Sequence, residues 1–503
     1  MFFPPPEPEV TNPLEPTNLL FLFSDQHNRA FAGCYGHPVV KTPNLDSLAA
    51  RGVRFTNAYC NCPICVPSRA SLATGRYCHQ IGSWDNAFPY TGDGYRSWGH
   101  RLVERGHHVT TIGKLHYRDP KDPSGFPDQR IPMHVLDGKG DLYSLLRDEA
   151  PARPQLGEKV LQPKVGESSY TSYDTAICKE ACRWLAEESA GHGKPWVLFV
   201  SFSLPHHPLI APQEYIDLYP PEEVVFPAQY SLDERPRHPA LEELRRVLGL
   251  EGEADEMTVR RAVATYYAMC TYLDRRIGEV LSALADAGLT ESTRIMYSSD
   301  HGDLVGEHGL WMKHNMYEGS AGVPFIMAGP GIPAGKVVPY NISLVDCYPT
   351  ILECVGVPLR PDDSDLPGTS LFPIAKGESA PDRTAFSEYH AIGSKSGIFM
   401  IRNRRYKYVE YVGDQPQLFD LEDDPGELRD LAADPEFGDV LAACVRELRE
   451  ICDPVEVDRR AKADQEQKIE ENGGREAVRA EGFKIAYTPA PSEFRKQGAV
   501  VDP

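Results

Sequence analysis

Short apolar runs alternate with segments of helical periodicity through most of the chain. Apolar runs predict buried strands at 18–23, 109–112, 196–202, 294–298 and 325–328. Apolar spacing predicts helices at 42–51 and 259–287, with Gly288 following the second as a stop signal. Strands that alternate with helices indicate a large mixed, mostly parallel sheet with helices on both faces. The predicted fold class is therefore α/β.

The pattern changes after about residue 370. Short strand-like segments at 384–388, 397–402, 406–411 and 417–420 predict a small C-terminal antiparallel sheet, with a helix near 440–450. Residues 453–482 are strongly charged and weakly apolar, as in a solvated helix or a tail packed on a neighbouring subunit. We expect a large α/β domain over 1–375, a small α+β subdomain over 376–452 and a charged tail over 453–503.

Polar residues follow the carboxyl ends of several predicted strands. Open α/β sheets place their sites at that edge, so residues far apart in sequence can meet there. A helix cap is the alternative role for an aspartate in this position, and a structural hydrogen bond is the alternative for a histidine. The candidates are Asp25, Lys114, His116, His206, Asp300 and His301.

The run Cys65-Val-Pro-Ser-Arg69-Ala-Ser-Leu-Ala-Thr-Gly75-Arg is the most informative stretch of the chain. Pro67 suits the first position of a helix and Gly75 suits a left-handed stop, so we expect Cys65 at the N-terminus of a short helix. Free N–H groups and the positive end of the helix dipole make that place suitable for a sulfate or phosphate group. Arg69, one turn along, could hold the nucleophile and an oxygen of the anion.

Two other interpretations of this run stay open. Cys65 could be a buried structural cysteine before an ordinary helix. Cys60, Cys62 and Cys65 could bind a metal, although their spacing is irregular and no second Cys/His pair follows at finger distance.

The Cys65 run resembles the signature of the sulfatases, in which the cysteine is oxidised to formylglycine. Further motifs in the expected order carry a resemblance to the sulfatase branch of the alkaline phosphatase superfamily, from about residue 18 to about residue 434. They are Thr42-Pro-Asn-Leu-Asp46, Gly113-Lys-Leu-His116, Pro205-His-His-Pro208, Ser299-Asp-His-Gly302, Lys313 and Leu418-Phe-Asp-Leu421.

The resemblance implies one divalent cation beside the modified Cys65, bound by Asp25, Asp300 and His301. Calcium is the expected metal, because carboxylate oxygens suit it, and the imidazole also admits manganese or zinc. Many arylsulfatases carry paired aspartates after the first strand and asparagine in place of His301. The pattern here is more similar to choline sulfatases and phosphonate monoester hydrolases. Gln26 would replace the missing ligand or hydrogen-bond beside the site.

The resemblance also implies a mechanism. One hydroxyl of the hydrated aldehyde attacks sulfur, the metal's charge assists, and His206 or Lys313 protonates the leaving alcohol. The second hydroxyl loses its proton, with His116 as a candidate base, so that sulfate is expelled and the aldehyde returns. Lys114 and Arg69 stabilise charge on the transferred group. Asn86 is a further candidate for contact with the anion.

Composition limits the classes of partner that we expect the chain to bind. A net charge of −21 over 503 residues argues against nucleic acid and against an anionic membrane surface as partners. No apolar run reaches membrane-spanning length, and residues 1–16 lack the pattern of a signal peptide, so we expect a cytoplasmic protein. Twelve cysteines fit reduced thiols there. The resemblance adds a formylglycine-generating enzyme for maturation and a homodimer or homotetramer.

Three functions compete. The first is hydrolysis of a small sulfate monoester, and the second is hydrolysis of a phosphonate monoester or phosphodiester at the same site. The third is non-catalytic binding of an anionic ligand, which an intact set of candidate residues disfavours. Trp84, Tyr90, Trp98 and Tyr389 could form an aromatic box for a quaternary ammonium such as choline, with core packing as the alternative.

Overall fold

The computed structural model describes residues 15–380, 383–483 and 490–491. An eight-stranded sheet forms its centre. The strands are β1 (Asn18–Asp25), β2 (Gly52–Tyr59), β3 (Val109–Lys114), β4 (Asp128–Met133), β6 (Val197–Pro205), β8 (Thr293–Ser299), β9 (Gly322–Ala328) and β10 (Lys336–Ser343). Their order is β10-β2-β9-β8-β1-β6-β3-β4. β9 runs antiparallel to β2 and β8, and the other neighbouring pairs are parallel. The predicted mixed, mostly parallel sheet is confirmed.

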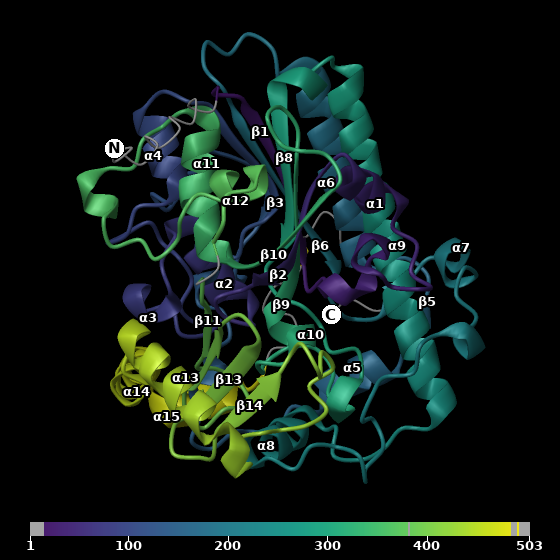
Figure 1. Ribbon diagram of the computed structural model, residues 1–503, viewed down its shortest axis with the longest axis vertical. Coiled ribbons are helices and arrows are strands. Elements are labelled where there is room, and N and C mark those ends of the chain that lie inside the picture. Colours follow the sequence, from purple (N-terminus) through teal and green to yellow (C-terminus); the bar gives the residue numbers. More distant parts are fainter. Residues whose placement is uncertain (1–14, 381–382, 484–489, 492–503) are drawn as a thin grey trace, which may run out of the picture.

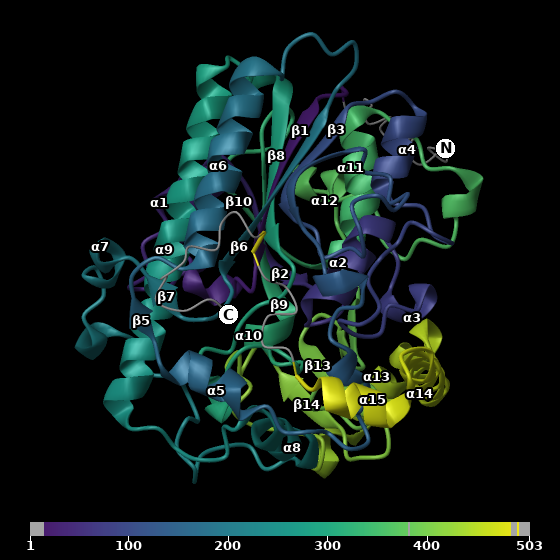
Figure 2. The ribbon, with the colours of Figure 1, turned by 180° about the vertical axis from the view of Figure 1, so that it is seen from behind.

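Helices cover both faces of this sheet (Figures 1 and 2). One face carries α1 (Pro43–Ala50), α6 (Ser169–Glu187) and α9 (Glu256–Asp286). The other carries α2 (Cys65–Thr74), α4 (Trp98–Glu104), α11 (Cys347–Val355) and α12 (Phe372–Lys376). Smaller elements connect them: α3 (Cys78–Ile81), α5 (Pro154–Leu161), α7 (Gln213–Ile216), α8 (Pro239–Leu248), α10 (Glu318–Ala321), β5 (Lys164–Val165) and β7 (Ile210–Ala211).

The central strands form the core because both of their faces are covered by helices. The side chains of residues 19–23 in β1 are fully buried, and Phe21 packs edge-on against Phe199 of β6 with ring centroids 5.2 Å apart. This two-sided burial explains why β1 is a continuous apolar run rather than an alternating one.

The C-terminal part forms a second, smaller sheet, as predicted. β11 (Ala385–Tyr389), β12 (Ile398–Arg402), β13 (Tyr406–Tyr411) and β14 (Gln417–Asp420) pair antiparallel in that order. The helices α13 (Gly438–Ile451), α14 (Pro454–Glu471) and α15 (Gly474–Glu481) follow and lie beside this sheet (Figure 1). The proposed division at residues 375 and 452 stays a prediction.

The charged segment is helical over Pro454–Glu471 and Gly474–Glu481 and packs on its own chain. α14 buries Val457, Ala461 and Ile469. Gln465 of α14 donates to the Asp85 carboxylate at 2.6 Å, and the indole of Trp84 donates to Asp464 at 2.8 Å. The apolar positions are widely spaced, which is why the sequence alone left both a helix and a tail open. Contacts of this segment with a second subunit stay a prediction.

One detail of the predicted elements is wrong. The helix of the cysteine run begins at Cys65 itself, so Pro67 occupies its third position and not its first. Pro67 still lies in the first turn, where a missing N–H removes no helical hydrogen bond. Gly75 does end the helix in a left-handed conformation, with φ 68°.

Some expectations fall outside the described residues. The expectation that the chain lacks a signal peptide rested mainly on residues 1–14, which are not described. The charged tail includes residues 484–489 and 492–503, which are also not described. In the part of the chain that the structure does describe, no helix is long and apolar enough to cross a bilayer.

Gly113 lets β3 deliver the residues that follow it. Its φ is 98°, and a Cβ there would lie 2.2 Å from the carbonyl oxygen of Ser201 and 2.7 Å from Ile177. A side chain is therefore excluded both by backbone conformation and by the neighbouring strand.

Substitution of Gly113 tests this close approach. We expect Gly113→Ala to lower the free energy of unfolding by roughly 2–4 kcal/mol, because strain and overpacking add. Gly193→Ala is the matched control, since a Cβ at Gly193 meets nothing within 4 Å. Urea denaturation of both variants measures the difference, and equal stability of the two would contradict the packing described here.

Candidate active site

Cys65 is the first residue of α2. It lies at the edge of the sheet where the parallel strands end, and its side chain is fully buried. The helix N-terminus itself offers fewer free donors than expected. The Val66 N–H donates to the side chain of Asn86 at 3.1 Å, and the Ser68 N–H donates to the Ile64 carbonyl at 3.2 Å. Pro67 has no N–H to offer. Binding of an anion beside Cys65 therefore depends mainly on charged side chains.

Two carboxylates and two cations surround the Cys65 thiol. Asp25 ends β1 and Asp300 follows β8, the neighbouring parallel strand. Arg69 bridges them: its Nε is 2.8 Å from Asp300 Oδ2, and its terminal nitrogen is 3.2 Å from Asp25 Oδ2. Lys114 Nζ, at the end of β3, lies 2.6 Å from the same Asp25 oxygen. All four side chains are buried.

Arg69 is also fixed by neutral groups. It donates to the backbone carbonyl of Lys114 at 2.6 Å and to the Ser201 hydroxyl at 2.9 Å. Its guanidinium lies 5.3 Å from the Phe23 ring centroid. Five N–H donors in a rigid fork suit such a bridging role, for which lysine would be a poor substitute.

The surroundings shift the pKa values of the two carboxyl groups in opposite directions. Burial would raise the pKa of Asp25, but Lys114, His206 and Arg69 together hold it well below its ordinary value. Burial, followed by the neighbouring Asp25 charge, raises the pKa of Asp300 to about 7. A cation between the two carboxylates would relieve this repulsion.

The four residues expected around the metal lie together. One ligand atom from each of Asp25, Cys65, Asp300 and His301 falls within 4.8 Å of the other three. His301 Nε2 lies 3.2 Å from the Cys65 sulfur, while its Nδ1 faces the Gly302 carbonyl at 3.0 Å. A carbonyl only accepts, so the ring proton is on Nδ1 and the Nε2 lone pair is free for a ligand. This is the arrangement that metal-binding histidines adopt, and the residues therefore fit a divalent cation.

The Cys65 thiol is a poor nucleophile in this environment. Burial and the Asp25 carboxylate raise its pKa to about 12. A thiol in this state stays protonated at neutral pH, and reactivity of cysteine depends on the thiolate.

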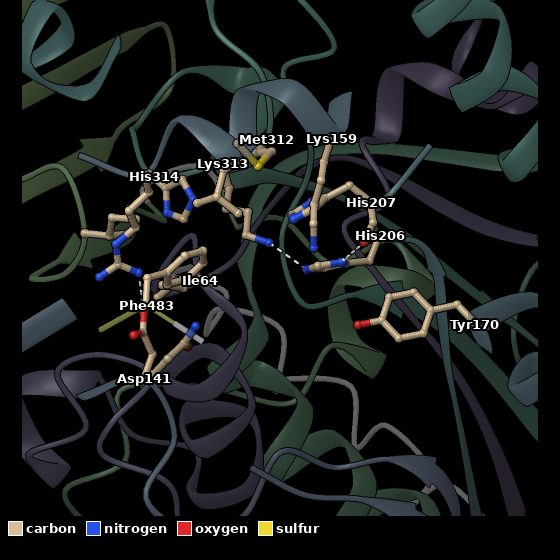
Figure 3. Close-up of a pocket in the computed structure, with 14 residues that line it drawn as sticks. Ile64, Asp141, Lys159, Tyr170, His206, His207, Met312, Lys313, His314 and Phe483 are labelled. Atoms are coloured by element: carbon tan, nitrogen blue, oxygen red, sulfur yellow. Dashed lines mark hydrogen bonds and ion pairs between the residues drawn. The ribbon is translucent and has the colours of Figure 1, made fainter. Parts of the chain in front are cut away.

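Lys313 and His206 form a hydrogen-bonded pair on the opposite side of the site. Lys313 Nζ donates to Gln26 Oε1 at 2.5 Å and contacts His206 Nε2 at 3.0 Å. His206 Nδ1 faces the His207 carbonyl at 2.6 Å, so its proton is on Nδ1 and Nε2 accepts from the lysine. Figure 3 shows Lys313 and His206 meeting across the cavity.

Gln26 orients this pair. Its amide nitrogen donates to Asp303 Oδ2 at 2.5 Å and to His207 Nδ1 at 3.2 Å. With the amide oxygen engaged by Lys313, both ends of the side chain have partners. The hydrogen-bonding alternative for Gln26 is therefore supported over the ligand alternative. Its φ of 66° is uncommon for a residue with a side chain.

His116 is the least constrained of the predicted residues. It is 1% exposed, and neither ring nitrogen has a hydrogen-bond partner among the described residues. Burial and the charges of Lys114 and Arg69 hold its pKa well below its ordinary value, so the ring is neutral and one of its two nitrogens carries no proton. Its φ of 58° adds backbone strain of the kind that clusters at functional sites.

The aromatic box predicted from the sequence is wrong. Trp98 packs against Phe126 with centroids 4.7 Å apart, and Tyr90 packs against Tyr117 at 5.3 Å. The Tyr389 hydroxyl accepts from His314, and Trp84 packs against His390. None of the four expected aromatic residues lines the cavity of Figure 3. Core packing, the alternative interpretation, explains them.

The structure thus brings every predicted site residue to one edge of the sheet. Sequence reasoning missed the supporting set of Asp303, Ser68 and Tyr170, and the cavity residues Arg153 and Lys159. Ser68 lies within the recognised Cys65 run, and Asp303 directly follows the recognised Ser299–Gly302 motif, so both positions carried a signal. Tyr170, Arg153 and Lys159 belong to no recognised motif, and only the folded chain brings them to the site.

Known proteins resemble the chain over most of its length. Residues 17–357 match the Sulfatase family, and residues 306–453 match the family described as N-sulphoglucosamine sulphohydrolase, C-terminal. Arylsulfatase K of Rattus norvegicus is 33% identical over 461 residues, which cover 86% of this chain and 77% of the relative. Choline-sulfatase of Rhizobium meliloti is 31% identical, and the match covers 83% of each protein.

Solved structures agree. The phosphonate monoester hydrolase of Agrobacterium radiobacter is 26% identical, with a TM-score of 0.69 over 86% of this chain and 95% of that structure. The resemblance that the motifs indicated is thereby confirmed. With a family match across more than half of its residues and a buried cluster of metal-ligating groups around Cys65, the chain belongs to the sulfatase family and is a sulfuric ester hydrolase.

Proposed function

We propose that the protein cleaves a sulfate monoester with a formylglycine made from Cys65 and one divalent cation, releasing inorganic sulfate and an alcohol. The observation that carries this proposal is the buried group of Asp25, Cys65, Asp300 and His301 at the start of α2. The unmodified thiol is protonated, so conversion by a formylglycine-generating enzyme gives Cys65 a chemistry that its environment denies to the thiol.

The cation would be held by Asp25, Asp300, His301 and the residue at position 65, and bound there it would supply positive charge to the nucleophile and to a sulfate oxygen. Calcium suits the two carboxylates, and the imidazole admits manganese or zinc. Arg69 and Lys114 hold the carboxylates in place and stabilise negative charge on the transferred group.

Two residues of the site, Lys313 and His116, carry out the proposed proton transfers. Lys313 donates a proton to the leaving alcohol, because it alone of the Lys313–His206 pair carries a proton that is not engaged by a carbonyl. His206 and Gln26 orient the lysine. His116 accepts a proton from the second hydroxyl of the hydrated aldehyde, since both of its ring nitrogens lack partners among the described residues. Expulsion of sulfate then restores the aldehyde.

A second candidate function is hydrolysis of a phosphonate monoester or phosphodiester at the same groups. The likeness to the phosphonate monoester hydrolase fold favours it. Sulfate and phosphonate monoesters share a tetrahedral centre with anionic oxygens, so the described residues could serve either.

Paired rates separate these functions. We expect 4-nitrophenyl sulfate to be hydrolysed with a higher kcat/KM than 4-nitrophenyl phenylphosphonate, with inorganic sulfate released in equal amount to the phenol. Cys65→Ala should lower both rates at least about 1000-fold, as removal of a nucleophile does. Cys34→Ala, a partly exposed cysteine away from the site, is the control. A preference for the phosphonate would establish the second function, and full activity of Cys65→Ala would exclude both.

Metal removal tests the cation. We expect prolonged chelation to abolish sulfate release and to lower the melting temperature, because two buried carboxylates lose the charge that offsets their repulsion. Calcium should restore both readouts, and recovery with manganese or zinc alone would assign the metal differently. Asp300→Asn should remove most of the effect of metal on melting temperature. Full activity after complete removal of divalent ions would contradict a metal-dependent site.

A further inference from the structure

A second cavity lies beside the loop formed by residues 304–312, apart from the catalytic one. It offers about 200 Å³ of free space, several times the room that one water needs. Trp311 lines this cavity, whereas Met312 and Lys313, which follow directly, line the cavity of Figure 3. The two cavities share no lining residue. Consecutive residues of one short segment therefore belong to two different spaces.

Arg235 is a buried cation of this second cavity without a carboxylate partner. It is 6% exposed. Its Nε donates to the Tyr230 carbonyl at 2.8 Å, and its Nη1 donates to the carbonyls of Leu250 at 3.2 Å and Glu251 at 3.4 Å. Nη2 donates to no described residue, and no described residue gives Arg235 an ion pair. Burial lowers the pKa of this guanidinium, and the exposed Glu253 opposes that effect only in part. Arginines removed from water are normally paired.

A second buried arginine acts on the first. Arg245 is 5% exposed, donates to the carbonyls of His308 at 2.8 Å and Pro236 at 3.3 Å, and leaves its Nε without a partner among the described residues. Burial, followed by the charge of Arg235, lowers the pKa of Arg245 to about 10. The described residues give Arg245 no ion pair either. Two guanidinium groups therefore repel each other, and an anion beside Arg235 would relieve that repulsion.

Both arginines contact consecutive residues of the 304–312 loop. Arg245 bonds the carbonyl of one residue, and the next residue, Gly309, lies so close to Arg235 that a Cβ there would be 2.2 Å from the Arg235 Nε. The loop closes through a 2.7 Å hydrogen bond between the backbones of its two ends, directly before Lys313. The position of this loop therefore bears on the position of Lys313.

Trp311 adds a neutral donor to the same cavity. It is 2% exposed, and its Nε1–H has no partner among the described residues. A buried indole N–H usually has one. Arg235 is held against Gly309, two residues before Trp311, and both side chains belong to residues that line the cavity. Guanidinium and indole N–H groups only donate, so the partner that they lack is an acceptor.

We propose that this cavity is a second, non-catalytic binding site for a small oxyanion, which accepts hydrogen bonds from Nη2 of Arg235 and from the indole of Trp311. Leu161 and Leu250 also line the cavity, so a carboxylate on a small apolar body suits it better than inorganic sulfate does. The bound anion offsets the charge of the arginine pair and holds the 304–312 loop. The site does not depend on the proposed function, because neither donor belongs to the catalytic groups.

The indole signals of ¹⁵N-labelled tryptophan test this site in the full-length, metal-loaded protein. The chain has five tryptophans, and Trp311→Phe identifies the signal of Trp311. Acetate, benzoate and sulfate are titrated as sodium salts, with sodium chloride keeping the ionic strength constant. We expect benzoate to shift the Trp311 signal saturably while the other four signals stay in place. Acetate should bind more weakly, because it leaves the apolar lining uncovered.

Matched variants test the two donors. Arg235→Met removes the charge and should weaken benzoate binding by about tenfold or more, because a hydrogen bond to a charged group is lost. Arg237→Met is the control, since the Arg237 side chain is 74% exposed, and its affinity should stay within about twofold of wild type. Arg235 also bonds the backbone, so Trp311→Phe serves as a milder second variant. It keeps the guanidinium and should weaken binding by about three- to tenfold in calorimetry.

A further variant separates this cavity from the catalytic centre, where anions can also bind. The Trp311 signal should respond to benzoate in Lys114→Met with an affinity within about threefold of wild type. Loss of the response in Lys114→Met would place the anion at the catalytic groups and overturn the proposal. No saturable shift of the Trp311 signal by any of the three anions, or equal affinities of wild type and Arg235→Met, would overturn it as well. A response to sulfate alone would support the site and assign it to an inorganic anion.

Discussion

Two buried carboxylates held close together are the constraint on which the rest of the site depends. Parallel pairing of β1 with β8 brings Asp25 and Asp300 to the same edge of the sheet, and burial, together with the neighbouring Asp25 charge, raises the pKa of Asp300 to about 7. Arg69 contacts both carboxylates and Lys114 contacts Asp25, and these positive charges offset part of the repulsion. A buried carboxylate without such partners would be too costly to retain. The pairing of β1 with β8 therefore sets the positions of the two carboxylates. These carboxylates, together with the start of α2, in turn favour a bound cation.

The same arrangement fixes where each chemical step can occur. α2 places the residue at position 65 against both carboxylates, while Gln26 holds Lys313 on the far side, toward the cavity. In the proposed mechanism, the nucleophile and the proton donor would therefore approach a bound sulfate from two directions, as an in-line displacement requires.

Much of the fold and of the catalytic set could be predicted from the sequence, because strand-end position and local motifs coincide. Asp25, Lys114 and Asp300 each follow an apolar run, and a parallel sheet brings such ends together. The direction of β9 could not be predicted, since a short apolar run carries no sign of orientation. Arg153 and Lys159 belong to an amphipathic stretch that looks solvated. Their burial depends on contacts distant in sequence.

The most direct test of the central claim is the mass of the tryptic peptide Phe55–Arg69 from protein co-expressed with a formylglycine-generating enzyme. Cys65 converted to formylglycine, seen as loss of the sulfur and gain of an aldehyde oxygen at that residue alone, is the result that our account predicts. Cys60 and Cys62 in the same peptide serve as internal controls and should remain thiols. An enzyme that releases sulfate from esters while Cys65 remains an unmodified thiol would contradict the account.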